Sequence, residues 1–161
     1  MRNTLLKQIA NTLYINVQQV SQNDLFTGKM GIALFFYEYV RSGGSFHYHE
    51  AADRLIEMIW ENLPQTENEL YEIVQGINYL ISNKYIDADP DILEEIYESI
   101  PYPIEEIPIK HFSLDREVSM KELEEYVNHK IQHLIYSKDL SLDNGLAGLG
   151  MALICNKSIP H

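Results

Sequence analysis

Apolar residues recur every three to four positions along almost the whole chain, which is the spacing of one face of an α-helix. No stretch alternates between apolar and polar residues as a half-buried strand does. We therefore predict an all-α protein. The predicted helices cover residues 3–20, 28–40, 48–63, 66–81, 89–100, 119–136 and the stretch that opens at 144.

Capping residues mark several helix starts. Thr66 to Glu69 and Ser119 to Glu122 each fit a capping box, in which side chains at both ends bond backbone N–H groups of the first turn. Asp89 before Pro90 is a cap followed by proline in the first turn. Residues 101–112 contain three prolines and predict an extended connector.

The second and the last predicted helices open with the same glycine pattern. Gly28 and Gly31 begin the first copy, and Gly145 and Gly148 begin the other. Each copy follows an amphipathic helix and starts one that is apolar nearly all round, which indicates burial on most sides. We interpret this as a repeated pair of outer and inner helices. The fourth helix is a weaker copy that keeps Gly76.

Glycines three positions apart share one helix face, and two interpretations stay open. They allow a neighbouring backbone to pack closely, or they leave the first-turn N–H groups open to a ligand. The ligand-facing candidates are Gly28, Gly31, Asp143, Gly145 and Gly148. Asp143 is also a plausible helix N-cap.

The stretches LFTGKMGIALFFYEY and LDNGLAGLGMAL resemble the glycine-rich inner-helix motifs of lanthionine synthetase C-like (LanC-like) proteins. The resemblance covers most of the chain, as three outer/inner helix pairs. It implies an α/α toroid-like array, of which a single domain over residues 1–161 would form about half. In enzymes of that family, zinc held by two cysteines and a histidine activates a cysteine thiolate. The thiolate adds to a dehydrated residue of a lantibiotic precursor peptide and closes the lanthionine ring.

The chain departs from the family where that chemistry would lie. It has one cysteine, Cys155, so it cannot supply two thiolates to zinc. We therefore expect no zinc, no catalytic residues, and a peptide- or protein-binding role. Two alternatives stay open: half of a zinc-dependent lanthionine cyclase that another chain completes, or a purely structural helical module. His129 and His133 are weak metal candidates, because they are four positions apart but have no marked third ligand.

The composition of the chain limits the classes of partner that we expect. The 24 acidic and 12 basic residues give a net charge of −12, which argues against nucleic acid or an anionic membrane as the partner. A single cysteine and the lack of a long apolar run lead us to expect a cytoplasmic protein. We also expect homo-oligomers, or docking of a second protein, through an exposed C-terminal helix pair. The apolar residues expected at that edge are Leu146, Leu149, Met151, Leu153 and Ile154.

Overall fold

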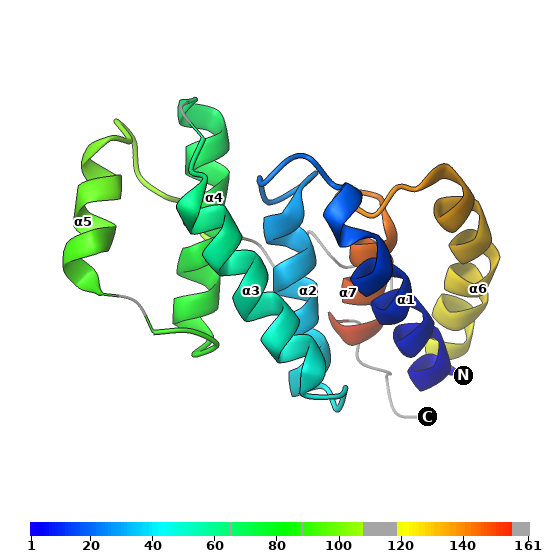
Figure 1. The fold of residues 1–161 in the computed structure, drawn as a ribbon. Coiled ribbons are helices and arrows are strands. Elements are labelled where there is room, and N and C mark those ends of the chain that lie inside the picture. Colours follow the sequence, from blue (N-terminus) through cyan, green and yellow to red (C-terminus); the bar gives the residue numbers. More distant parts are fainter. Residues whose placement is uncertain (65, 88, 108–118, 156–161) are drawn as a thin grey trace.

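The computed structural model describes residues 1–64, 66–87, 89–107 and 119–155, and these form helices and loops without a strand (Figure 1). The all-α prediction is therefore confirmed for this part of the chain. The helices are α1 (Arg2–Asn16), the 3₁₀ helix η1 (Val17–Gln19), α2 (Lys29–Arg41), α3 (His47–Glu61), α4 (Glu67–Ser82), α5 (Pro90–Glu98), α6 (Met120–Ser137) and α7 (Leu146–Cys155). None of these helices is long and apolar enough to cross a membrane.

Two of the three predicted caps form. The Ser119 side chain accepts a hydrogen bond from the Glu122 N–H at 3.2 Å, and Asp89 accepts one from the Asp91 N–H at 2.9 Å. The capping box at Thr66 is wrong, since that side chain makes no cap hydrogen bond to α4. The predicted connector is non-helical over 101–107, and its remaining residues lie outside the described ranges.

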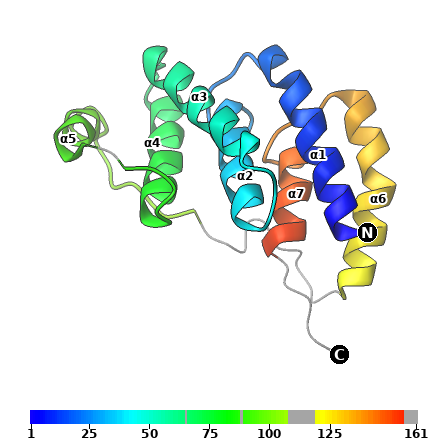
Figure 2. The same ribbon diagram turned by 60° about the horizontal axis from the view of Figure 1, so that its bottom comes forward.

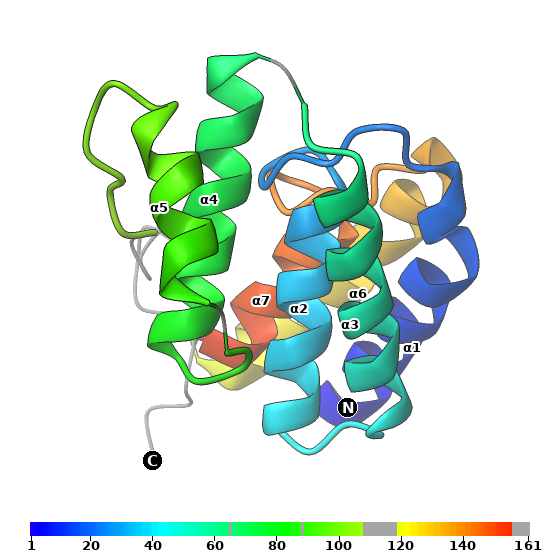
Figure 3. The same cartoon turned by 60° about the vertical axis from the view of Figure 1, so that its left-hand side comes forward.

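The helices lie in two rows (Figures 1 and 2). From one end to the other, α7, α2 and α4 make the inner row, and α6, α1 and α3 the outer row. α1 contacts both α7 and α6, and α2 contacts α7, α3 and α4. α5 lies beyond α4, at the edge (Figure 3). The C-terminal pair α6/α7 thus packs beside the N-terminal pair α1/α2, although the two pairs are distant in sequence.

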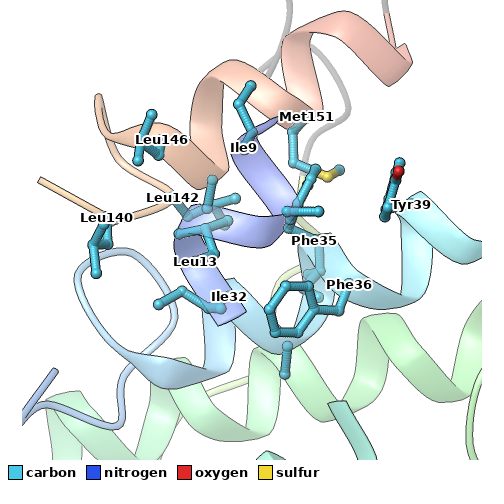
Figure 4. Close-up of a cluster of buried hydrophobic side chains, with 14 of the residues drawn as sticks. Ile9, Leu13, Ile32, Phe35, Phe36, Tyr39, Leu140, Leu142, Leu146 and Met151 are labelled. Carbon is cyan, nitrogen blue, oxygen red and sulfur yellow. The ribbon is translucent and has the colours of Figure 1, made fainter. Parts of the chain in front are cut away.

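The core lies where α1, α2 and α7 meet. Leu13 of α1, Ile32 of α2, Leu142 of the second glycine-containing stretch and Met151 of α7 belong to one cluster of buried side chains (Figure 4). Most residues of α2 and α7 are buried, which confirms the prediction for helices that are apolar nearly all round. At one close approach the Phe35 ring of α2 occupies the space that a Cβ at position 150 of α7 would need.

The expected apolar C-terminal edge is wrong. Leu146, Met151 and Leu153 are fully buried, and Leu149 is 9% exposed. The reason is that α7 does not end a stack: α1, α2 and α6 all contact it. The Arg2 Nε also donates a hydrogen bond of 3.0 Å to the carbonyl oxygen of Leu153, which fixes the end of α7 to the start of α1. Self-association remains a prediction, but the exposed apolar surface from which it was inferred is buried in the structure.

Candidate functional site

The two glycine-containing stretches fold into matching loops, which we call the first glycine loop (residues 22–28) and the second glycine loop (residues 139–145). In the first, the Lys29 N–H donates to the Gln22 carbonyl oxygen at 3.0 Å. In the second, the Leu146 N–H donates to the Asp139 carbonyl oxygen, also at 3.0 Å. The same hydrogen bond across the same seven-residue separation shows that the sequence repeat is also a structural repeat.

The glycines let each loop lie directly against the helix that it precedes. A Cβ at Gly148 would lie less than 3.0 Å from the Leu142 carbonyl oxygen, and a Cβ at Gly31 would clash in the same way with the Leu25 carbonyl oxygen. Gly31 also meets the Cβ of Leu142, at 2.8 Å from the added atom. The close-packing interpretation is confirmed for Gly31 and Gly148.

Gly28 and Gly145 are buried against their own loops. A Cβ at Gly28 would lie 2.6 Å from the Asp24 backbone nitrogen, and one at Gly145 would lie 2.6 Å from the Ser141 carbonyl oxygen. Side-chain atoms crowd the same positions: the Asp24 Oδ1 atom is 2.5 Å from the first and an Asp139 Oδ1 atom 2.5 Å from the second. Gly28 and Gly145 therefore shape the loops from within, whereas Gly31 and Gly148 make room for the loops from the helix side.

The first-turn N–H groups of α7 are used inside the second loop. Besides Leu146, the Ala147 N–H donates to the Leu140 carbonyl oxygen at 3.4 Å and the Gly148 N–H to the Ser141 carbonyl oxygen at 3.2 Å. Because backbone oxygens satisfy these donors, Asp143 does not act as the N-cap, and that alternative is wrong. Asp143 is exposed at the tip of the loop.

The two loops are joined to each other and to α4. The Asp143 N–H donates to the Phe26 carbonyl oxygen at 2.9 Å. The Phe26 N–H in turn donates to the Glu72 carboxylate of α4 at 3.3 Å. Burial raises the pKa of Glu72, and the negative charges of Asp24, Glu69 and Asp143 raise it further, whereas the Phe26 N–H lowers it.

A cleft of about 350 Å³ with mixed polar and apolar walls opens between the two glycine loops and the end of α1. We call it the loop cleft. Its walls carry carboxamide, hydroxyl and charged groups together with a few apolar ones. The lining residues are Thr12, Asn16, Gln19, Val20, Ser21, Gln22, Thr27, Ile135, Lys138, Asp139, Leu140 and Ser141. The loops that contain the ligand-facing candidates Gly28, Asp143 and Gly145 thus contribute to a cleft, through residues beside these candidates.

The candidate metal ligands gain no third ligand among the described residues. His129 and His133 are exposed on α6, and the described residues contain no group of three or more His, Cys, Asp or Glu side chains that could hold a metal ion. Burial raises the pKa of the Cys155 thiol to about 11, and the nearby Glu38 carboxylate adds to the shift. A thiol with that pKa is almost entirely protonated near neutral pH, so it is a poor nucleophile.

Sequence reasoning missed a polar cluster at the C-terminal ends of α2 and α4. The Tyr79 hydroxyl of α4 donates to the Glu38 carboxylate of α2 at 2.6 Å. The Arg41 guanidinium lies over the Tyr85 ring, 3.6 Å from its centroid. Burial raises the pKa of both Tyr79 and Tyr85, and the neighbouring Glu38 carboxylate raises it further. These residues are distant in sequence and follow ordinary helical spacing, so no sequence signal marks the cluster.

Comparison with known proteins adds no relative, since no family model, curated protein or solved structure matches this chain. The class that the described residues define is an all-α domain of two helix rows with a repeated glycine loop.

Proposed function

We propose that this chain is a LanC-like helical scaffold that binds a peptide, in a role related to thioether peptide modification, without a zinc site of its own. Two features support the proposal: the repeated glycine loops and the apolar inner helices that follow them. In the proposal, the three helix pairs are about half of an α/α toroid. The loop cleft is the observation that carries the binding role.

The chemistry of the loop cleft suits a peptide. Carboxamides and hydroxyls each donate and accept hydrogen bonds, as peptide groups do. Gln19 brings a carboxamide to the cleft. The Asn16 side-chain nitrogen already donates to the Thr12 carbonyl oxygen, and the Ser141 hydroxyl already donates within its own loop, so these two side chains offer the cleft mainly acceptors. Lys138 and Asp139 add one charge of each sign. A volume of about 350 Å³ falls at the small end of ligand clefts and fits one or two side chains with their main chain.

The test is selection of peptides from a random displayed library on the purified chain, followed by calorimetry with the synthetic peptides. Gln19→Ala and Lys138→Asn change exposed cleft residues, and asparagine tolerates the left-handed backbone of position 138, where φ is 58°. We expect each to weaken binding about tenfold or more. Gln132→Ala, on the exposed side of α6, is the matched control and should leave the affinity unchanged.

Two outcomes would overturn the proposal. One is a selection that yields no specific peptide, and the other is peptides whose affinity the cleft variants leave unaltered. Repeating the calorimetry with a chelator separates the binding scaffold from the alternative of a zinc-dependent half-enzyme. Binding that persists in the chelator supports the scaffold, and binding that is lost supports the half-enzyme.

A further inference from the structure

Helix α4 carries a polar stripe on one face. Tyr71, Gln75, Asn78 and Ser82 follow one another at intervals of three or four residues, so they share that face. Gln75 is only 8% exposed, and it is the buried polar side chain among the described residues. A buried carboxamide must be hydrogen-bonded to repay its desolvation, so its partner shows what the stripe binds.

The partner of Gln75 is the main chain of an extended segment. After α5 the chain runs back to α4 (Figures 1 and 2). There the Gln75 Nε2 donates to the Glu105 carbonyl oxygen at 3.1 Å, and the Glu105 N–H donates to the Tyr71 hydroxyl at 3.0 Å. One helix face thus holds both backbone groups of one residue. It does so with one donor and one acceptor, one turn apart, and without using the Glu105 side chain.

The stripe continues past this contact into a second cleft, of about 430 Å³, which we call the α4 cleft. One wall is α4, from Gln75 to Asn83, and the other is the extended segment 104–107. Groups on the helix wall keep unused hydrogen-bonding capacity among the described residues. The Tyr97 hydroxyl donates to the Asn78 Oδ1 and leaves the Nδ2 as a donor, and the Asn83 Nδ2 donates to the Tyr79 carbonyl oxygen and leaves the Oδ1 as an acceptor.

We infer that the α4 cleft binds a second extended peptide segment through its main chain, in the way that α4 already binds residue 105. The available donor at Asn78 and acceptor at Asn83 match the N–H and C=O groups of such a segment. Glu105 and Glu106 line the opposite wall, in a chain of net charge −12, so a peptide with basic side chains is favoured. The α4 cleft shares no lining residue with the loop cleft, so this inference does not depend on the proposed function.

The probe is a short blocked peptide in which valine and lysine alternate, because that pattern favours an extended chain with charge on one side. It is titrated into the isotope-labelled chain while the side-chain NH₂ resonances of Asn78 and Asn83 are followed by NMR. We expect saturable shifts of both. N-methylation of the peptide backbone removes the N–H donors without removing any side chain, and it should weaken binding about tenfold or more. A peptide in which glutamate replaces each lysine should bind more weakly than the valine–lysine peptide at low salt, because its charge has the same sign as that of the chain.

Variants place the binding on α4. Ser82→Ala changes an exposed residue of the stripe. Asn78→Leu removes the unused donor together with the acceptor of the Tyr97 hydroxyl, so the helix content of this variant is checked by circular dichroism. Both should weaken binding, whereas Gln19→Ala in the loop cleft should not. Equal binding of the N-methylated peptide, no saturable shift, loss of binding in Gln19→Ala alone, or a peptide bound as a helix would each overturn the inference.

Discussion

Replacing Gly148 by alanine tests why the chain accepts glycine inside a buried helix. On propensity alone, alanine in a helix interior is favoured over glycine by about 1 kcal/mol. The added Cβ would, however, lie less than 3.0 Å from the Leu142 carbonyl oxygen, so the second glycine loop must move away from α7. That loop is held by the N–H groups of residues 146, 147 and 148, with hydrogen bonds of 3.0, 3.4 and 3.2 Å. Each such bond contributes about 1 kcal/mol.

Weakening these three bonds and overpacking the contact should cost more than the propensity gain. We expect Gly148→Ala to lower the free energy of unfolding by about 1–3 kcal/mol. For a chain of this size, the midpoint of thermal unfolding should fall by about 2–12 °C. Urea unfolding followed by circular dichroism measures the first quantity and a thermal scan the second.

The matched control is Gly76→Ala on α4. There the added Cβ would meet the buried Met30 side chain, at 2.6 Å from its Cγ and 2.9 Å from its Sδ, and an unbranched side chain adjusts more readily than a backbone carbonyl. We expect this variant to destabilise the chain less than Gly148→Ala does. If Gly148→Ala proves as stable as the wild type, position 148 faces open space. In that case the ligand-facing interpretation of the glycines would be favoured.

Four further outcomes follow from the structure. The raised pKa of Glu72 means that the folded state holds this proton more tightly than the unfolded state, so stability falls as pH rises through the interval above the ordinary value of 4.5. Glu72→Gln keeps an oxygen acceptor for the Phe26 N–H and should remove that fall. Urea unfolding at a series of pH values measures the change of stability with pH, and the same change in the variant as in the wild type would contradict this prediction. The Cys155 thiol, with a pKa of about 11 against 9.0, should react with iodoacetamide about 100-fold more slowly in the folded than in the unfolded chain at mildly alkaline pH. Purified chain should contain no stoichiometric zinc by elemental analysis, and replacing both His129 and His133 by alanine should change nothing. Leu149→Asp places a charge at a position that is 9% exposed, so it should unfold the chain rather than yield a folded monomer, which circular dichroism with light scattering distinguishes.

Local signals in the sequence predicted local structure well. Ser119 and Asp89 cap the helices that they precede, because a cap depends only on residues within one turn. The glycine repeat predicted two matching helix starts for the same reason. Thr66 carries an equally good capping pattern but makes no cap hydrogen bond. The pattern shows that a cap can form, and the geometry at the start of the helix decides whether it does.

Features that depend on which helices meet could not be predicted in this way. The burial of Leu149 and Leu153 follows from the position of α6/α7 beside α1/α2, and nothing in the apolar pattern of α7 says what covers it. The loop cleft and the α4 cleft are of the same kind. Each cleft is lined by residues that are distant in sequence. Carboxamides and hydroxyls such as those of Gln75 and Ser82 form no sequence motif that predicts a cleft.

The hydrogen bonds between the loops explain how α4 relates to the repeat. In the second glycine loop, the Asp143 N–H donates to a backbone oxygen of the first loop, at Phe26. A third loop beside the first would be expected to offer Phe26 the same kind of acceptor. Instead α4 is helical from Glu67 to Ser82, without a glycine loop, and the Glu72 carboxylate accepts the Phe26 N–H. A side chain thus replaces a main-chain carbonyl at the end of the array, and its raised pKa reflects the cost of placing a carboxylate there. The loss of the glycine loop in the fourth helix and the position of Glu72 are therefore two parts of one arrangement that ends the series of loops.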